Sequence, residues 1–428
     1  MNYKIFNINK KDIVVVTGAG GKTSLIFSLA EKLSKLGKVL ITTTTKMYKP
    51  SPNNYEFLKI ESNIYLGNKK NITVIGSKEE NNKITSLSYK EIQDLQNNFD
   101  YILIEGDGAK EKLIKFWNDS EPCIPEFATK IIGVINSEIF KLDFNENNAH
   151  RYNLALKKLI KFSNKKIDSS FLSSYILDAN FFKNCSSKCE KYIFFNGIDG
   201  NNKIEKLKKT LETINILLKN NYFINIVLGS IKNNEFYPFQ KVDAVVMASG
   251  FSNRMKTNKL KLKYNNLSFL EICLKNLSSI PFNEIIVCGR EKWSEELSKK
   301  YNFKYFYNFL AHKGQSESIK LGVKNSKGDG IVFFTADQPF LKEKTILELY
   351  YNFLKTNIIT IPTANNNRFS PVFFPENKKC ELLSLNGDTG GKNIIKTTPI
   401  LNFVKFSSEL EFFDIDTETE FQFIKNLK

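Results

Sequence analysis

Short apolar strands that alternate with helical patterns run through both halves of this 428-residue chain. Each strand is a run of three to five residues that are mostly β-branched, aliphatic or aromatic, which is typical of a buried parallel strand. The predicted strands are Ile13–Val16, Val39–Ile41, Tyr101–Ile104, Ile131–Ile135, Tyr192–Phe195 and Ile224–Leu228 in the first half, and Ala244–Met247, Glu284–Val287, Lys304–Tyr307, Ile331–Phe334 and Ile358–Ile361 in the second. The alternation favours α/β folds with mainly parallel sheets in both halves.

Two domains are expected, because 428 residues exceed the usual size of one domain. Residues 231–240 separate two apolar strands, carry turn residues and lack a sustained period. We therefore predict an N-terminal domain over 1–230, a linker over 231–240 and a C-terminal domain over 241–428.

The net charge is strongly positive: 62 Lys and Arg face 45 Asp and Glu, which gives +17 at pH 7. Such a balance can serve nucleic acid, a membrane surface or small anions. The lysines are scattered through a chain rich in Lys, Asn, Ile and Phe, a composition that an AT-rich genome favours. We expect no nucleic-acid partner.

The remaining composition predicts a soluble protein of the reducing cytoplasm. Residues 1–11 are polar and mixed, unlike a signal peptide. No apolar run approaches the roughly 18 residues that a membrane span requires, so we expect no membrane partner. The six cysteines are too sparse for a disulfide framework.

A glycine-rich loop follows the first predicted strand directly, and a helical pattern that closes at Gly37 follows the loop. Strand, glycine loop, Lys-Thr and helix form the context that a phosphate-binding P-loop requires. The expected phosphate-binding residues are Gly18, Gly20, Gly21, Lys22 and Thr23. Lys22 would reach the β- and γ-phosphate oxygens, and the Thr23 hydroxyl would bind Mg²⁺. Val16 replaces the first glycine of the standard motif, and a glycine-rich turn without a ligand is the alternative.

Polar residues also follow later strands of this half. Glu105 and Asp107 come after an apolar run and are two residues apart, so on an extended chain they share a face. An acidic residue in this position orders Mg²⁺ or its water in P-loop proteins, so both are candidate metal ligands. Thr42–Lys46 suits phosphate contacts and a plain β-edge equally. Asn196 and Asp199 resemble a guanine-reading element, although Gly197 stands between them and weakens that interpretation.

The second half opens with a strand that ends in small residues: Ala248, Ser249 and Gly250. Their lack of bulk lets backbone N–H groups approach a phosphate. Arg254 and Lys259 add positive charge just beyond. A strand that ends in a small, basic loop is typical of a nucleoside triphosphate site, and an ordinary tight turn is the alternative.

Motifs in the second half resemble, in the same order, those of the molybdopterin nucleotidyltransferases, the MobA/MocA-like group. They are Met247-Ala248-Ser249-Gly250 with Arg254-Met255-Lys256 and Lys259, Asn308 with Gly314-Gln315-Ser316-Glu317-Ser318, Thr335-Ala336-Asp337-Gln338-Pro339, Ser370-Pro371-Val372-Phe373-Phe374, Asn386-Gly387-Asp388-Thr389-Gly390 and Asp414-Ile415-Asp416-Thr417. Lys256 stands where the group usually has a glycine.

This resemblance implies a Rossmann-like fold and a nucleotidyl transfer, in which a pterin phosphate attacks a nucleoside triphosphate and pyrophosphate leaves. The implied catalytic residues are Arg254, Lys259, Asp337 and Asp388, and the implied nucleotide-binding residues are Ala248, Ser249, Gly250 and Ser316. Asp337 and Asp388 are also the implied Mg²⁺ ligands. The alternatives are a helix cap for Asp337 and a turn residue for Asp388.

The pair of small residues before Gly250 accompanies CTP use in the group that the chain resembles. We therefore expect CTP as the nucleotide and molybdopterin as the acceptor. Transfer of a guanylyl group to molybdopterin, or of a nucleotidyl group to a sugar phosphate, is the alternative.

The first half resembles the YqeC family, accessory proteins linked to selenium-dependent molybdenum hydroxylases. The matching motifs are Thr17–Thr23, Thr42–Lys46, Glu105-Gly106-Asp107-Gly108-Ala109, Glu121-Pro122 and His150-Arg151. The resemblance implies a P-loop NTPase fold that binds ATP or GTP, and a molybdenum hydroxylase apoenzyme as a partner. The alternative is a nucleotide-dependent delivery module without chemistry of its own.

Overall fold

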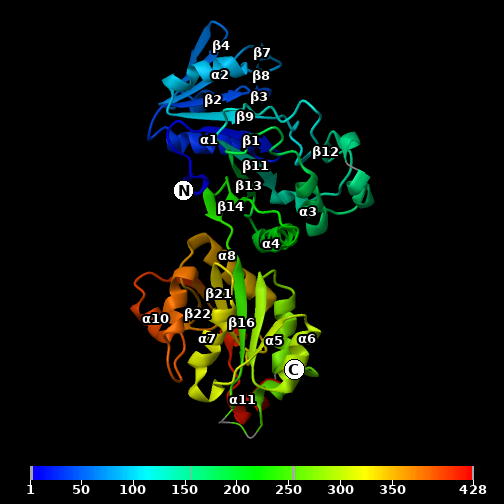
Figure 1. Cartoon of the computed structure of the whole chain (residues 1–428), viewed down its shortest axis with the longest axis vertical. Coiled ribbons are helices and arrows are strands. Elements are labelled where there is room, and N and C mark those ends of the chain that lie inside the picture. The colour runs from blue at the N-terminus through cyan, green and yellow to red at the C-terminus, as the bar shows by residue number, and fades with distance from the viewer. Residues whose placement is uncertain (1–2, 156, 253–254, 256, 427–428) are drawn as a thin grey trace. The chain divides into compact units, whose positions relative to one another are not determined.

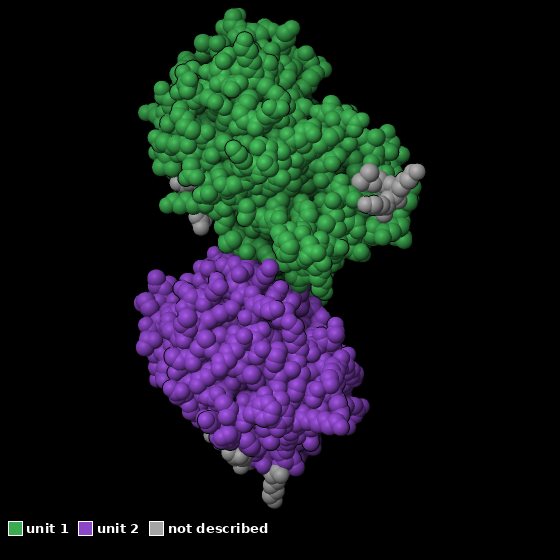
Figure 2. Space-filling model, in the orientation of Figure 1, with its two compact units in different colours: residues 1–239 green, residues 240–428 purple. Residues whose placement is uncertain are grey.

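The computed structural model describes residues 3–155, 157–252, 255 and 257–426. The chain divides into two compact units, Met1–Phe239 and Gln240–Lys428, which Figure 2 shows in two colours. Within the described residues, no helix is both long and apolar enough to cross a membrane. All six cysteines have free thiols.

Among the described residues of the first unit, the main sheet has ten strands in the order β15-β14-β13-β11-β1-β9-β2-β6-β4-β5. Their bounds are β1 (Ile13–Gly18), β2 (Val39–Thr43), β4 (Phe57–Ile60), β5 (Asn63–Leu66), β6 (Ile72–Gly76), β9 (Tyr101–Glu105), β11 (Lys130–Asn136), β13 (Glu190–Asn196), β14 (Asn225–Ser230) and β15 (Glu235–Pro238). Neighbours from β14 to β4 run parallel, whereas β15 and β5 pair antiparallel at the two edges.

Strand β1 lies inside this sheet, with β11 on one side and β9 on the other (Figure 1). All six of its residues are buried, as a parallel strand covered on both faces requires. Helix α1 (Lys22–Leu33) follows and packs on β1, β2 and β9 through Leu25, Leu29 and Leu33. The loop between β1 and α1 therefore lies at the carboxyl edge of the sheet.

Smaller elements cover the rest of this unit. Helix α2 (Tyr89–Leu95) precedes β9 in the chain. Helix α3 (Ser169–Asp178) precedes β13, and helix α4 (Lys203–Lys219) connects β13 to β14. Short strands form two small sheets: β3 (Lys46–Tyr48), β7 (Glu79–Glu80) and β8 (Lys83–Thr85) in one, and β10 (Ile114–Lys115) and β12 (Ala149–His150) in the other. The segment 231–240, expected as a linker, contains β15, which extends the sheet of the first unit.

In the second unit the described strands of the main sheet follow the order β20-β19-β16-β21-β24-β22-β23, and β25 pairs with β22. The bounds are β16 (Val242–Ala248), β19 (Glu284–Gly289), β20 (Lys304–Tyr307), β21 (Gly330–Thr335), β22 (Thr360–Ala364), β23 (Asn367–Arg368), β24 (Val372–Pro375) and β25 (Asn402–Lys405). β16, β19, β20 and β21 are parallel, and β24 runs antiparallel between β21 and β22.

The helices of this unit alternate with the strands (Figure 1). They are α5 (Phe269–Ser278), α6 (Lys292–Lys300), α7 (Gln315–Asn325), α8 (Glu343–Thr356), α9 (Lys379–Leu383), α10 (Lys392–Thr397) and α11 (Glu418–Lys425). The prediction of α/β folds with mainly parallel sheets is confirmed. The antiparallel β24 is an insertion that the apolar pattern alone did not distinguish.

Candidate functional site

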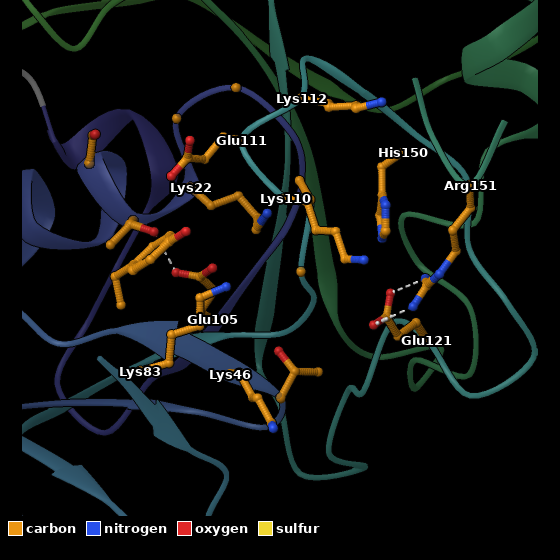
Figure 3. A pocket seen from close by; sticks show the side chains of 18 residues that line it. Lys22, Lys46, Lys83, Glu105, Lys110, Glu111, Lys112, Glu121, His150 and Arg151 are labelled. Atoms are coloured by element: carbon orange, nitrogen blue, oxygen red, sulfur yellow. Dashed lines mark hydrogen bonds and ion pairs between the residues drawn. The ribbon is translucent and has the colours of Figure 1, made fainter. Parts of the chain in front are cut away.

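A cavity of about 590 Å³ opens at the carboxyl edge of the first sheet (Figure 3). One end, the glycine-loop end, is formed by Gly20, Gly21, Lys22, Thr23 and Glu105. The other, the His150 end, is formed by Lys110, Lys112, Glu121, His150 and Arg151. Thr45, Lys46 and Lys83 also line the cavity. The structure therefore joins segments that the sequence separates by more than a hundred residues.

The glycine loop has the left-handed backbone that its sequence predicts. Gly18 has a φ of +94°, and a Cβ there would lie 2.4 Å from the carbonyl oxygen of Val134. Only glycine fits this position without a shift of β11. The carbonyl oxygen of Gly20 accepts hydrogen bonds from the side-chain amides of Asn136 (3.0 Å) and Asn196 (3.1 Å), which end β11 and β13.

The side chains of Asn196 and Asp199, the predicted guanine-reading residues, form hydrogen bonds to other residues of the first unit. The side-chain Oδ1 of Asn196 accepts from the Ile231 amide at 3.0 Å, and the Asp199 carboxylate accepts from the Ser230 hydroxyl. Both side chains bind nearby chain segments rather than line the cavity, so this geometry does not support a guanine-reading role.

Lys22 is folded back over the loop. Its Nζ donates to the Gly18 carbonyl at 2.8 Å and lies 3.2 Å from Asp107 Oδ1, and the side chain is only 5% exposed. Thr23 Oγ1 donates to Glu105 Oε2 at 2.6 Å. Burial raises the pKa of Glu105, although Lys22 and Thr23 oppose that shift. Lys22 is thus paired with protein groups that phosphate oxygens could replace.

Asp107 has a different place from the one its spacing predicts. It is fully buried and does not line the cavity. Its Oδ2 accepts from the Gly18 amide (3.0 Å) and the Trp117 indole (2.7 Å), and lies 3.2 Å from Lys115 Nζ. Asp107 therefore holds the glycine loop, and of the three predicted metal ligands of this unit only Glu105 and Thr23 line the cavity.

A chain of ion pairs continues from Asp107 to the His150 end. Lys115 is fully buried and donates to Glu121 Oε2 at 2.8 Å. Arg151 binds both oxygens of Glu121, at 2.6 and 3.1 Å. Burial and the charges of Arg151, Lys115 and Lys110 lower the pKa of His150 from 6.5 to about 4, so its ring is neutral at pH 7.

The four threonines at the carboxyl end of β2, Thr42 to Thr45, contact different groups. The hydroxyls of Thr42, Thr43 and Thr44 donate to the carbonyl oxygens of Ile75 (2.8 Å), Glu105 (3.0 Å) and Cys123 (2.6 Å). Only Thr45 and Lys46 line the cavity. The first three threonines therefore bind neighbouring segments.

The second unit has a cavity of about 460 Å³ at the carboxyl ends of β16 and β21. It gathers five of the predicted site residues: Ser249, Gly250, Lys259, Asp337 and Asp388. Ala248 and Ser316 are buried and do not line it. Arg254 lies outside the described residues. His312 and Gln315, which the sequence did not single out, complete one side of the cavity.

The small residues after β16 differ in what they offer. Ser249 Oγ donates to the Cys288 carbonyl at 2.8 Å and is 3.3 Å from Asn308 Nδ2, so its hydroxyl is used inside the protein. Apart from its chain neighbours, a Cβ at Gly250 would meet no atom of the described residues within 4 Å. The space beside Gly250 is therefore open to a ligand.

Lys259 stands between two aspartates. Its amine pairs with Asp337 Oδ2 and lies 2.7 Å from Asp416 Oδ1. Burial lowers the pKa of Lys259, but the two carboxylates outweigh burial and the net shift is upward. Burial and the charges of Asp337 and Asp416 raise the pKa of a third carboxyl, Asp414, to about 7.

Asp414 and Asp416 were not among the predicted site residues. The signal that could have identified them is the Asp-x-Asp spacing in the last matched motif. Asp337 Oδ1 is buried and has no hydrogen-bond partner among the described residues. Asp388 is exposed. Its Oδ1 accepts a hydrogen bond at 3.2 Å from the backbone amide of Gln315, which is the first residue of α7.

A divalent cation fits this cavity chemically. Mg²⁺ is usually held by one or two carboxylates, with water and substrate phosphates as its other ligands. Asp337 offers a buried oxygen without a partner among the described residues, and Asp416 is the second carboxylate that accepts from Lys259. The described residues hold no group of three or more His, Cys, Asp or Glu side chains arranged for a metal. A substrate phosphate would have to complete the coordination.

Together, the fold and the two cavities define a two-unit α/β protein with a nucleotidyltransferase-type C-terminal unit. Residues 14–153 match the YqeC protein family, and residues 244–401 match the MobA-like NTP transferase domain. The chain therefore carries a YqeC domain followed by a MobA-like nucleotidyltransferase domain, as the motifs predict.

Relatives match each unit separately. The YqeC protein of Escherichia coli is 32% identical over 33% of this chain. The match covers 57% of that protein's length. A protein of Natranaerobius thermophilus named probable molybdenum cofactor guanylyltransferase is 28% identical over 32% of this chain and 68% of its own. A solved nucleotidyl transferase from Methanothermobacter thermautotroptrophicus shares 19% identity over 44% of this chain and 97% of its own, with a TM-score of 0.39.

Proposed function

We propose that the C-terminal unit transfers a cytidylyl group from CTP to molybdopterin and releases pyrophosphate. The observation that carries this proposal is the cavity at the carboxyl ends of β16 and β21, where Lys259 and Asp337 meet beside the open space at Gly250. Ligands bind at this edge of open α/β sheets. The match to the MobA-like domain supports the reaction class.

The main physical problem of this reaction is charge, because a phosphorylated pterin and a triphosphate repel each other. Gly250 lets the main chain approach the triphosphate without a side chain in the way. Lys259 would leave its aspartates to neutralise phosphate oxygens. The pterin phosphate oxygen then bonds to the α-phosphorus as the α–β bridging bond breaks, and the electron pair leaves with pyrophosphate.

The same exchange leaves a place for a metal. Once Lys259 turns to the triphosphate, Asp337 and Asp416 lose their cation and would hold Mg²⁺. The ion supplies charge neutralisation and orientation of the phosphates when bound. We keep Asp388 as a more distant candidate ligand, because its oxygen already holds the first turn of α7. Arg254 stays a predicted contact of the triphosphate.

CTP is proposed over GTP because Ala248 and Ser249 are the pair of small residues that precedes Gly250. The relative named a guanylyltransferase favours GTP instead. Purified protein should be incubated with molybdopterin, Mg²⁺ and either CTP or GTP, and pyrophosphate release followed. Faster release with CTP is expected. GTP preference would assign guanylyl transfer, and activity only with a sugar phosphate would exclude molybdopterin.

We propose that the N-terminal unit binds ATP or GTP at the glycine loop and assists maturation of a selenium-dependent molybdenum hydroxylase. Lys22, Thr23 and Glu105 in one cavity support nucleotide binding, and the match to the YqeC family supports the pathway. Turnover of ATP or GTP that Lys22→Ala abolishes would show an NTPase. Binding without turnover would favour a delivery module, and no binding would refute the proposal.

A further inference from the structure

The N-terminal cavity carries positive charge at the end away from the glycine loop as well as at the loop itself. Six cationic side chains line it among the described residues, against three carboxylates: Lys22, Lys46, Lys83, Lys110, Lys112 and Arg151 against Glu105, Glu111 and Glu121. Of these cations only Lys22 belongs to the glycine loop. In Figure 3 the His150 and Arg151 side chains occupy the side of the cavity away from Lys22 and Glu105.

The donors at the His150 end are available to a ligand. Lys110 is exposed and makes no hydrogen bond or ion pair with another described residue. Glu121 fixes the Arg151 guanidinium through two of its five N–H groups, which leaves the others for a second partner. The charges of Lys110 and Arg151 both reach His150 and hold its ring neutral. This end thus presents an oriented guanidinium, an amine and an imidazole.

The backbone at this end is strained. Lys110, Glu111 and Arg151 have φ values of 47°, 63° and 58°, a region that residues other than glycine rarely adopt. All three line the same cavity. Non-glycine residues held in this conformation cluster at ligand sites, where the surrounding structure maintains them. The cavity lining therefore contains three positive-φ residues, and the two cationic ones lie at this end.

From the geometry we infer that the His150 end binds a second ligand, a small oxyanion of the phosphate or carboxylate class, beside the nucleotide. Arg151 and Lys110 supply charge-assisted hydrogen bonds, and His150 supplies a neutral N–H. This inference rests on the proposal that the glycine loop binds a nucleotide, since that nucleotide occupies the other end. The N-terminal unit is then a two-ligand site rather than a nucleotide switch alone.

The chain contains two histidines, and each lines one cavity: His150 the N-terminal and His312 the C-terminal. NMR of the full chain with labelled histidine therefore reports both cavities at once, and His312→Gln assigns the signals. Binding of a non-hydrolysable ATP or GTP analogue with Mg²⁺ is measured first, which tests the nucleotide proposal separately. Inorganic phosphate or acetate is then added in separate arms.

Phosphate or acetate should shift the His150 signal and raise the pH at which it titrates by about one unit, since a nearby anion favours the charged ring. Lys110→Gln should weaken that response at least tenfold, whereas Lys188→Gln, an exposed lysine outside both cavities, should not change it. Whichever anion acts assigns the class. If the analogue binds and neither anion moves His150, or if Lys110→Gln responds like wild type, the inference is overturned.

Discussion

Each cavity of this chain is lined by a lysine that forms an ion pair with an aspartate, but the two ion pairs have different surroundings. In the N-terminal unit, Lys22 and Asp107 begin a chain of alternating charges that runs through Lys115 and Glu121 to Arg151. In the C-terminal unit, one lysine, Lys259, faces Asp337 and Asp416, with Asp414 nearby.

The difference indicates what each cavity lacks. The N-terminal chain joins three cations to two carboxylates. Of the further cations that line the cavity, Lys46 pairs with Glu80 and Lys112 donates to backbone carbonyls, whereas Lys110 has no partner among the described residues. The C-terminal cluster has more carboxylates than cations, so it needs a cation in addition to Lys259. We interpret the first cavity as a receptor for oxyanions and the second as a receptor for a metal with its triphosphate.

The largest effect is expected from Asp337→Asn. Loss of the carboxylate that pairs with Lys259 and has one oxygen without a partner should lower pyrophosphate release on the order of 10³-fold, as loss of a key electrostatic group does in other enzymes. Nucleotide binding at the N-terminal cavity should be unchanged. Asp388→Asn is the matched variant and should lose less, because Asp388 is exposed and caps α7. Wild-type turnover in Asp337→Asn would contradict the comparison.

Lys115→Met tests the series of ion pairs that runs from Lys22 to Arg151. Removal of this fully buried cation leaves Asp107 and Glu121 with fewer partners and should lower the free energy of unfolding by about 3 kcal/mol, at the lower end for a broken buried pair because Asp107 keeps Lys22 and two N–H donors. Denaturant unfolding measures it. Lys46→Met, which removes an exposed pair with Glu80, is the control and should change little. Equal losses in the two variants would show that the buried ion pairs of Lys115 stabilise the fold no more than an exposed pair does.

Gly18→Ala and Gly250→Ala separate the two loops. Gly18→Ala should destabilise the fold by about 2 kcal/mol, since its Cβ would collide with β11. Gly250→Ala should leave stability within about 0.5 kcal/mol, because its Cβ meets no atom of the described residues beyond its chain neighbours, yet it should weaken triphosphate binding. Thermal unfolding and nucleotide titration measure the pair. Unchanged CTP affinity in Gly250→Ala would place the triphosphate elsewhere.

The last prediction concerns pH. The pKa of His150 is about 4 in the folded protein, below its ordinary 6.5, because of burial and the charges of Arg151, Lys115 and Lys110, which Glu121 partly opposes. The unfolded chain therefore binds more protons between those values, and stability should fall as the pH drops from 6.5 to 4. In His150→Gln this fall should be shallower. Parallel pH profiles for variant and wild type would refute the shift.

The sequence predicted the central strands and the loops after β1 and β16 because these depend on local pattern, whereas the outer strands β4, β5, β6 and β15 and the strands β23, β24 and β25 were not predicted. A continuous apolar run followed by small residues predicts a buried strand that ends at a ligand edge, and β1 and β16 both follow this rule. Glu105 and Asp107 show where the rule ends. Side chains two residues apart share a face only while the strand continues, but β9 ends at Glu105 and the chain turns, which buries Asp107 under the glycine loop.

Long-range contacts explain what the sequence could not supply. Asp416 meets Lys259 across 157 positions of the chain, and no local spacing records that distance. Ser249 was expected to let its backbone N–H approach a phosphate because the residue is small, and that stays a prediction. The bond from its hydroxyl to the Cys288 carbonyl of the neighbouring strand β19 is a contact that the sequence did not indicate.

The two asparagine amides on the Gly20 carbonyl have a consequence for how quickly and tightly an anion is captured. In a trans peptide the carbonyl and the following N–H point in opposite directions, so holding the Gly20 oxygen against Asn136 and Asn196 turns the Gly21 N–H the other way. The loop is thus organised before any ligand arrives. If a phosphate binds there, as proposed, little of its affinity would be lost to ordering the loop.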